Sequence, residues 1–238
     1  MPSRRVAFIS DLHANLVALD ATLAELDHLG VTEIVCLGDI VDLGPEPQAV
    51  LDRLAQREVR CVRGNHDPLD EHPGHPLLQA IEDWTRDRLG PATLAELAVL
   101  PDALEIELDG VRLLCVHGSP RDINDQILAE TPVDELLEWT AGREFDVLVC
   151  GHTHVQLLRR VDERVFVNVG SLGMPFARPY AGQTPEVLPW AEYAILGVEG
   201  GSVSVDLRRV AYDVDRFRAS LHATGYPGAD EWLDNWRL

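Results

Sequence analysis

The stretch Val147-Leu148-Val149-Cys150-Gly151-His152-Thr153-His154 decides the fold, because an apolar run stops there abruptly in polar residues. A short apolar run without alternation is typical of a strand that is buried on both faces of a sheet. In open α/β sheets, ligands bind beyond the carboxyl ends of such strands. We therefore interpret Gly151 to His154 as part of a functional site at the end of a strand.

Four other segments have the same form, an apolar run that ends in Asp, His or Asn. They are residues 6–13 (VAFISDLH), 34–39 (IVCLGD), 62–67 (VRGNHD) and 113–118 (LLCVHG). Parallel strands carry their carboxyl ends at the same edge of a sheet. One sheet of parallel type would therefore be enough to gather all five polar ends at one rim.

The order of the expected elements indicates an α/β fold. Strands and helices alternate over residues 5–10, 15–29, 33–37, 45–57 and 60–62. This pattern predicts right-handed parallel crossovers. A hairpin is expected over residues 104–116 with its turn at Asp109-Gly110, and two further antiparallel strands are expected to turn at Gly200-Gly201.

One segment interrupts this rhythm. Residues 68–101 have a helical pattern, and we expect an inserted helical pair there, beside the rim. A Pro-rich stretch, residues 174–190, is expected to form a long loop. Without an internal repeat or a low-complexity linker, residues 1–238 are predicted to form a single domain with two packed sheets and flanking helices.

Composition restricts the partners. The 238 residues include 46% hydrophobic residues, and 40 Asp and Glu against 20 Lys and Arg give a formal charge of −20. Such a surface repels long nucleic acids and anionic membranes. No apolar stretch approaches the roughly 18 residues of a membrane span, and the basic N-terminus is followed by too short an apolar run for a signal peptide. We expect a cytoplasmic protein, and its oligomeric state stays open.

The cysteines are not expected to carry chemistry. They lie inside strand-like runs, at Cys36, Cys61, Cys115 and Cys150. No pair has the C-x-x-C spacing of a zinc site, and a buried free cysteine behaves as a small hydrophobic residue. We therefore interpret all four as core residues.

Histidine is concentrated at the strand ends. Five of the nine histidines end strand-like runs: His13, His66, His117, His152 and His154. In an extended segment, residues two apart point the same way, so the pair Asp11 and His13 is expected to hold one cation together. By the same argument, His152 and His154 are expected to direct both rings toward a common rim.

These residue types predict a metal site. The candidate ligands are Asp11, His13, Asp39, Asn65, His117, His152 and His154. Imidazole and oxygen ligands without a thiolate suit manganese, iron, nickel or zinc more than calcium. Seven ligands are too many for one tetrahedral site and suit two ions that share a carboxylate, a device for displacement at phosphorus. His66 and Asp67 are not among these seven candidate ligands. A His held by a carboxylate is suited to general acid catalysis.

The ordered motifs resemble those of one known family. They are Asp11-x-His13, Gly38-Asp39, Gly64-Asn65-His66-Asp67, His117-Gly118 and Gly151-His152-Thr153-His154. This set is similar to that of the calcineurin-like metallophosphoesterase superfamily, over residues 6 to about 171. The resemblance implies an α/β fold with a four-layer sandwich of two mixed β-sheets flanked by helices.

The resemblance also implies a role for each motif residue. The first metal would be held by Asp11, His13, Asp39 and His154. The second would be held by Asp39 as the bridge, with Asn65, His117 and His152. His66 would protonate the leaving oxygen or stabilise the transition state, and Asp67 would orient it.

Two further motifs resemble the small prokaryotic phosphoesterases of that superfamily. They are His117-Gly118-Ser119-Pro120 and Asn168-x-Gly170-Ser171-x-Gly173. Such relatives usually have Gly at the place of Ala14 and Pro at the place of Val169, and often Arg at the place of Phe176. Arg178 is the candidate to replace that phosphate contact from the same loop. The alternative is that Arg178 is an ordinary exposed arginine.

The leading hypothesis is a dinuclear metal-dependent phosphoesterase, with manganese as the expected metal and iron, nickel or zinc as alternatives. A metal-bound hydroxide would attack phosphodiesters or small nucleotide phosphoesters in line. The alternatives are a phosphomonoesterase or protein phosphatase, a diadenosine polyphosphate hydrolase, and a non-catalytic scaffold. A dinucleotide-binding oxidoreductase is excluded because no G-x-G-x-x-G follows the first strand.

Overall fold

Two five-stranded sheets form the centre of the computed structural model, which describes residues 4–70 and 74–236. The first sheet has the order β10-β9-β1-β2-β3. Its strands are β1 (Arg5–Ile9), β2 (Glu33–Cys36), β3 (Arg60–Cys61), β9 (Ala191–Glu199) and β10 (Ser202–Val210). The three strands β1, β2 and β3 are parallel, and β9 runs antiparallel to both β1 and β10.

The second sheet has the order β4-β5-β6-β8-β7. Its strands are β4 (Ala103–Leu108), β5 (Val111–Val116), β6 (Val147–Cys150), β7 (Leu157–Val161) and β8 (Arg164–Asn168). Its three central strands are parallel, and each edge strand is antiparallel to its neighbour. Both sheets are therefore mixed, as predicted.

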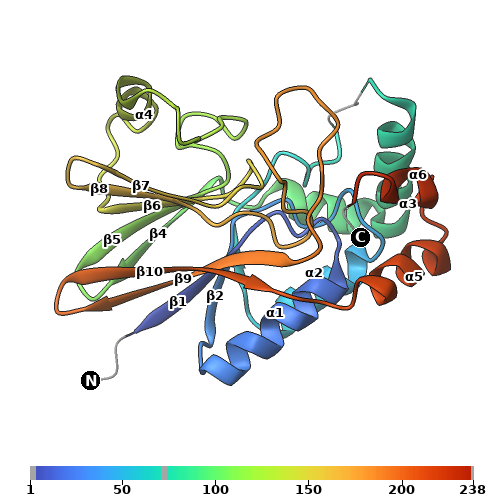
Figure 1. Ribbon diagram of the computed structural model, residues 1–238, viewed down its shortest axis with the longest axis horizontal. Helices are drawn as coiled ribbons and strands as arrows, with labels where there is room; N and C mark the ends of the chain where they lie inside the picture. Colours follow the sequence, from blue (N-terminus) through green and yellow to red (C-terminus); the bar gives the residue numbers. More distant parts are fainter. Residues whose placement is uncertain (1–3, 71–73, 237–238) are drawn as a thin grey trace.

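Helices cover the outer faces of the two sheets. They are α1 (Leu16–Leu29), α2 (Pro47–Gln56), α3 (Pro76–Ala98), α4 (Val133–Trp139), α5 (Val214–Thr224) and α6 (Ala229–Leu233). Figure 1 shows α1 and α2 outside the first sheet, α4 outside the second, and α3, α5 and α6 together at one end. Alternation along β1 places Ala7 and Ile9 in the core under α1, whereas Val6 and Phe8 pack between the sheets. The predicted four-layer sandwich is confirmed.

Helix α1 shows how local sequence places a motif. The side chain of Asn15 caps the helix by accepting from the amide of Ala18 at 3.0 Å, and Gly30 ends it in the left-handed conformation with φ 67°. Leu19, Leu23 and Leu26 are buried on the side facing the sheet. The helix predicted over residues 15–29 is confirmed, and it fixes the end of the loop that carries the first motif.

The expectation that one sheet gathers all five motifs was wrong. Three motifs follow β1, β2 and β3 of the first sheet, and two follow β5 and β6 of the second. The hairpin of β4 and β5 starts a new sheet, because β5 pairs with β6 rather than with β3. The motifs still meet, since the two stacked sheets present these strand ends on the same side.

The segment 68–101 is mostly helix α3, which is broken at Gly90 (φ 73°, ψ 168°), directly before Pro91. Ile81, Leu89 and Leu97 are buried in the same core as α1 and α2. That this span is an insert, and that residues 1–238 form one domain, stays a prediction, and residues 71–73 lie outside the described part. Strand β7 and helix α6 were not anticipated from the sequence. Over residues 4–70 and 74–236, no helix is long and apolar enough to cross a bilayer.

Candidate metal centre

The motif residues lie in tight turns rather than in extended segments. Five of them have left-handed backbone angles: Asp11 (φ 52°), His13 (φ 44°), Asp39 (φ 54°), His152 (φ 66°) and His154 (φ 57°). Residues other than glycine rarely adopt positive φ, and such strain clusters at functional sites. The turns are held between loops, with the amide of Asp11 donating to Gly38 O and that of His13 to Asp39 O, both at 3.0 Å. The prediction that these residues lie in extended segments was therefore wrong, although their side chains do converge.

The first group consists of Asp11, His13, Asp39 and His154. These four residues are buried, and one ligand atom of each lies within 4.8 Å of the others. Nε2 of His154 is 3.2 Å from Oδ1 of Asp11 and 3.1 Å from Nε2 of His13. Nε2 of His13 is 3.9 Å from Oδ2 of Asp39. Two imidazoles and two carboxylates thus surround one point.

The second group shares Asp39 with the first and adds His117 and His152. Nε2 of His117 is 3.4 Å from Oδ2 of Asp39. Oδ1 of Asn65 lies 3.0 Å from Nε2 of His117 and 2.9 Å from Nδ1 of His152, so Asn65 joins this group. The structure brings together the same two sets that the family resemblance implies. Their occupation by two ions stays a prediction.

Hydrogen bonds behind the rings fix three of the imidazoles. Nδ1 of His13 lies 3.1 Å from the carbonyl oxygen of Asp42. Nδ1 of His117 lies 2.7 Å from that of Leu37, and Nδ1 of His154 lies 2.7 Å from that of Met174. A carbonyl oxygen only accepts, so Nδ1 carries the hydrogen in each ring. In the neutral ring, Nε2 then presents its lone pair to the centre, which is the arrangement of a metal-binding histidine.

Unpaired acceptors show that these residues fit a metal. The Nε2 atoms of His13 and His154 lie 3.1 Å apart, and in two neutral rings with Nδ1 protonated their lone pairs face each other. Oδ1 of Asp11 is buried without a hydrogen-bond partner. Buried acceptors that face one another are costly unless a proton or a cation lies between them. A divalent cation satisfies all three atoms at once.

The charges of the group suit cation binding. Burial, with help from His154, lowers the pKa of His13 to about 3, and burial lowers the pKa of His152 to about 4. Burial opposes ionisation of Asp11, but the imidazoles of His154 and His117 hold its pKa at about 2. Near neutral pH, His13 and His152 are therefore neutral and Asp11 is ionised, which are the protonation states that metal ligands need.

His117 differs from its neighbours. Burial alone would lower its pKa, but the carboxylates of Asp39 and Asp11 raise it to about 9. In the absence of a metal, this imidazole therefore carries a proton at neutral pH. A cation bound by the second group has to displace that proton, so metal binding should release it.

Asp67 holds the loops around the centre together. Its Oδ2 accepts from the amides of Asp39 at 3.0 Å and Gly64 at 2.7 Å, and its Oδ1 accepts from the amide of Ile40 at 2.7 Å. Burial and then the charge of Asp39 raise the pKa of Asp67 to about 6. The carboxylate joins the loops that follow β2 and β3. That Asp67 also orients His66 stays a prediction.

Asp42 contacts His66 directly. Its Oδ2 lies 3.2 Å from Nδ1 of His66, and the carboxylate is buried. The His66 side chain is 24% exposed, whereas those of the first group are at most 7% exposed, so His66 faces the outside of the centre. Sequence reasoning missed Asp42, and its only signal is a second Asp three residues after Asp39.

The structure leaves Arg178 outside the centre. Its side chain is exposed on the loop 174–190, and no ion pair joins it to any described residue. Phe176 instead reaches the first group and stacks on the imidazole of His154, with ring centroids 4.2 Å apart and planes at 27°. An apolar ring thus stands where similar proteins often carry Arg. A role for Arg178 in substrate binding stays a prediction.

The cysteines remain core residues. Cys36, Cys115 and Cys150 are buried, Cys61 is partly buried, and all four are free thiols. Burial raises the pKa of Cys115 to about 12 and that of Cys150 further still. None of them belongs to either ligand group.

Comparisons with known proteins agree with this geometry. The family model for the calcineurin-like phosphoesterase superfamily domain matches residues 5–188. An uncharacterised protein of Methanocaldococcus jannaschii is 25% identical over 98% of this chain and 97% of its own length, and phosphodiesterase YfcE of Escherichia coli is 26% identical over 72% and 80%. The crystal structure of a metallophosphoesterase from Sphaerobacter thermophilus is 28% identical, covers 97% of this chain and 98% of its own, and has a TM-score of 0.75. The chain belongs to the calcineurin-like phosphoesterase superfamily.

Proposed function

We propose that the protein is a dinuclear metal-dependent phosphoesterase that hydrolyses phosphodiesters or small nucleotide phosphoesters. The observation that carries this proposal is the sharing of Asp39 between two buried ligand groups. A carboxylate common to both groups is what two neighbouring ions need. Family membership supports the hydrolysis of phosphoric esters.

Each group has a donor set suited to a first-row transition ion. Asp11, His13, Asp39 and His154 would hold one ion, and Asp39, Asn65, His117 and His152 would hold the other. Imidazole with carboxylate and amide oxygen suits manganese, iron, nickel or zinc, and we propose manganese. Two such metal ions side by side would acidify a water molecule and neutralise charge on a phosphoryl group.

His66 is the group placed to move a proton. Its partly exposed imidazole lies beside Asn65, and the buried carboxylate of Asp42 contacts its Nδ1. A carboxylate next to an imidazole favours the protonated ring, which can then donate to the leaving oxygen. General acid catalysis of this kind is typically worth about 10² to 10⁴ in rate.

A diester is favoured over a monoester by the charges around the centre. Among the described residues that hydrogen-bond to the two groups, none is Lys or Arg. A monoester dianion carries more charge than a diester and depends more on such cations. A phosphomonoesterase or protein phosphatase is the second candidate, because one similar protein of Escherichia coli is named serine/threonine-protein phosphatase 2. With a formal charge of −20, we propose small substrates rather than long nucleic acids.

The proposal is tested by metal analysis and two substrates. The purified protein is loaded separately with Mn²⁺, Fe²⁺, Ni²⁺ and Zn²⁺ and assayed on bis-p-nitrophenyl phosphate and p-nitrophenyl phosphate. We expect two ions per chain and faster hydrolysis of the diester. Faster hydrolysis of the monoester would support the phosphatase alternative. No bound metal and no turnover would instead favour a scaffold.

A further inference from the structure

A cavity of about 260 Å³ opens beside the second ligand group. It is lined by Arg63, Asn65, Pro68, Asp70, Ile123 and Asn124. Asn65 belongs both to this wall and to the second group, where its Oδ1 faces His117 and His152. A phosphoester held at that group therefore has this cavity next to it.

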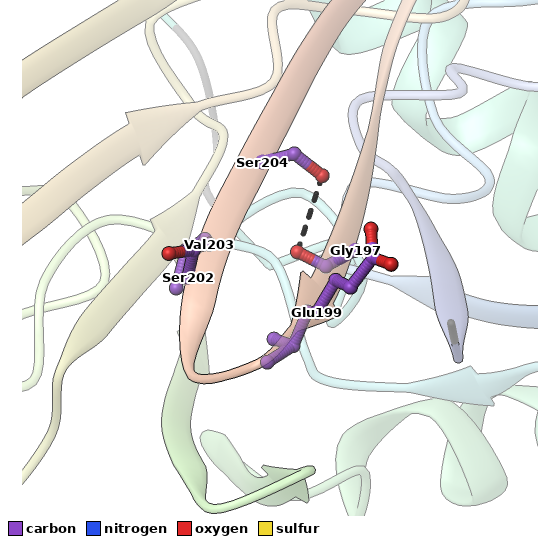
Figure 2. Close-up of a pocket in the computed structure, with 6 residues that line it drawn as sticks. Gly197, Glu199, Ser202, Val203 and Ser204 are labelled. Atoms are coloured by element: carbon purple, nitrogen blue, oxygen red, sulfur yellow. Dashed lines mark hydrogen bonds between the residues drawn. The ribbon is translucent and has the colours of Figure 1, made fainter. Parts of the chain in front are cut away.

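A second hollow, of about 200 Å³, lies in the hairpin of β9 and β10 (Figure 2). Figure 2 shows the hydroxyl of Ser204 directed at the carbonyl of Gly197, to which it donates at 3.2 Å. Gly197 pairs with Arg5 at the start of β1, whereas Asp11 follows the end of that strand. This hollow is therefore remote from the ligand groups, and of these two cavities it is the first that adjoins them.

One wall of the cavity is built onto a ligand-bearing segment. A Cβ atom on Gly118, the residue after His117, would lie 2.4 Å from the carbonyl oxygen of Ile123, so the loop packs directly on that glycine. The hydroxyl of Ser119 donates to Oδ2 of Asp125 at 2.5 Å and holds the same loop closed. The wall is thus preformed, as in most small-molecule sites.

The lining of the cavity contains one guanidinium and one carboxylate. Nη2 of Arg63 is 2.6 Å from Oδ1 of Asp102, so this guanidinium is already paired. Asp70 is exposed, and over residues 4–70 and 74–236 no cation lies within ion-pair distance of it. A ligand that brings a further negative charge into this cavity would be repelled. An uncharged ligand would not meet this repulsion.

The remaining lining combines apolar and amide groups. Pro68 and Ile123 offer apolar surface, and Asn65 and Asn124 offer amides. The cavity, of about 260 Å³, is slightly below the roughly 300–1,000 Å³ typical of ligand pockets, so it has room for one compact group. On the function proposed above, we propose that this cavity binds the leaving alcohol of the substrate and selects an uncharged group of nucleoside size over one that carries a further phosphate.

The selection is tested with two dinucleotides. One is adenylyl-(3′,5′)-adenosine, whose leaving group is adenosine, and the other carries an additional 3′-phosphate on that leaving adenosine. We expect wild-type kcat/KM to be at least about tenfold higher for the first. Asp70→Asn should reduce this ratio several-fold, and the matched surface change Asp162→Asn should leave it unchanged. Equal rates for the two dinucleotides in the wild type would overturn the selection.

Occupation of the cavity is tested without turnover. Calorimetry should give adenosine a Kd of about 1 mM or tighter. Ile123→Trp fills the cavity and should abolish this binding, whereas Leu158→Trp on exposed β7 should preserve it. No binding of adenosine to the wild type would overturn the assignment of the cavity. Hydrolysis of bis-p-nitrophenyl phosphate by the wild type is scored separately, so the proposed function can stand where the cavity assignment fails.

Discussion

Replacement of Asp42 by Asn tests whether His66 acts as a proton donor. The two side chains have nearly the same shape, and the backbone carbonyl of residue 42 still accepts from Nδ1 of His13. Only the negative charge beside Nδ1 of His66, 3.2 Å away, is removed. The metal ligands should therefore stay in place while the imidazolium loses the charge of Asp42 beside its Nδ1.

The size of the effect follows from that contact. A hydrogen bond to a charged group contributes about 1.5–3 kcal/mol, and about 1.4 kcal/mol corresponds to a factor of ten in rate. We expect Asp42→Asn to lower kcat for an alkyl leaving group by about 10- to 100-fold. For p-nitrophenol, which leaves readily without a proton, the loss should be at most a few-fold.

The assay compares bis-p-nitrophenyl phosphate with methyl and nucleoside esters over a range of pH. Without the carboxylate, the imidazolium is less stable, so the alkaline limb of the kcat profile should move to lower pH. Asp52→Asn is the matched control, because Asp52 is an exposed aspartate of α2 that accepts from Gln48 at 2.9 Å. An equal loss for both kinds of leaving group, or a metal content below that of the wild type, would refute the role of Asp42 in proton donation.

Asp39→Ala should lose both ions, because Asp39 belongs to both ligand groups, and two ions retained per chain by metal analysis would contradict the bridge. In the metal-free protein, folding raises the pKa of His117 from 6.5 to about 9, so the protonated imidazole stabilises the fold fully only below pH 6.5. The free energy of unfolding should therefore fall as the pH rises from 6.5 to 9. The loss should be about 3 kcal/mol in urea unfolding, and His117→Asn should remove this dependence on pH. Cys150→Ser should keep metal content and kcat within about twofold, because Cys150 lies in the core outside both groups; lost metal would show a role for the thiol.

The sequence was sufficient to predict the residues of the centre, because each of them directly follows a strand-like apolar run. The capping of α1 by Asn15 and Gly30 was also predictable, since it depends on neighbours in the chain. The contact between Asp42 and His66 was not, because it joins two loops 24 residues apart whose turns have no local signature. Phe176 was noted as a departure, but its stacking on His154 depends on the path of the loop 174–190.

The division of the motifs between two sheets would give a bound metal a structural role as well as a chemical one. Asp39 comes from the first sheet, and His117 and His152 come from the second, so an ion in the second group would link the two sheets. The left-handed turns at these positions and the facing lone pairs of His13 and His154 both disfavour the metal-free fold. A bound cation would relieve the repulsion between the lone pairs. The left-handed turns, which direct the side chains toward the centre, would remain. Metal binding should therefore raise the free energy of unfolding.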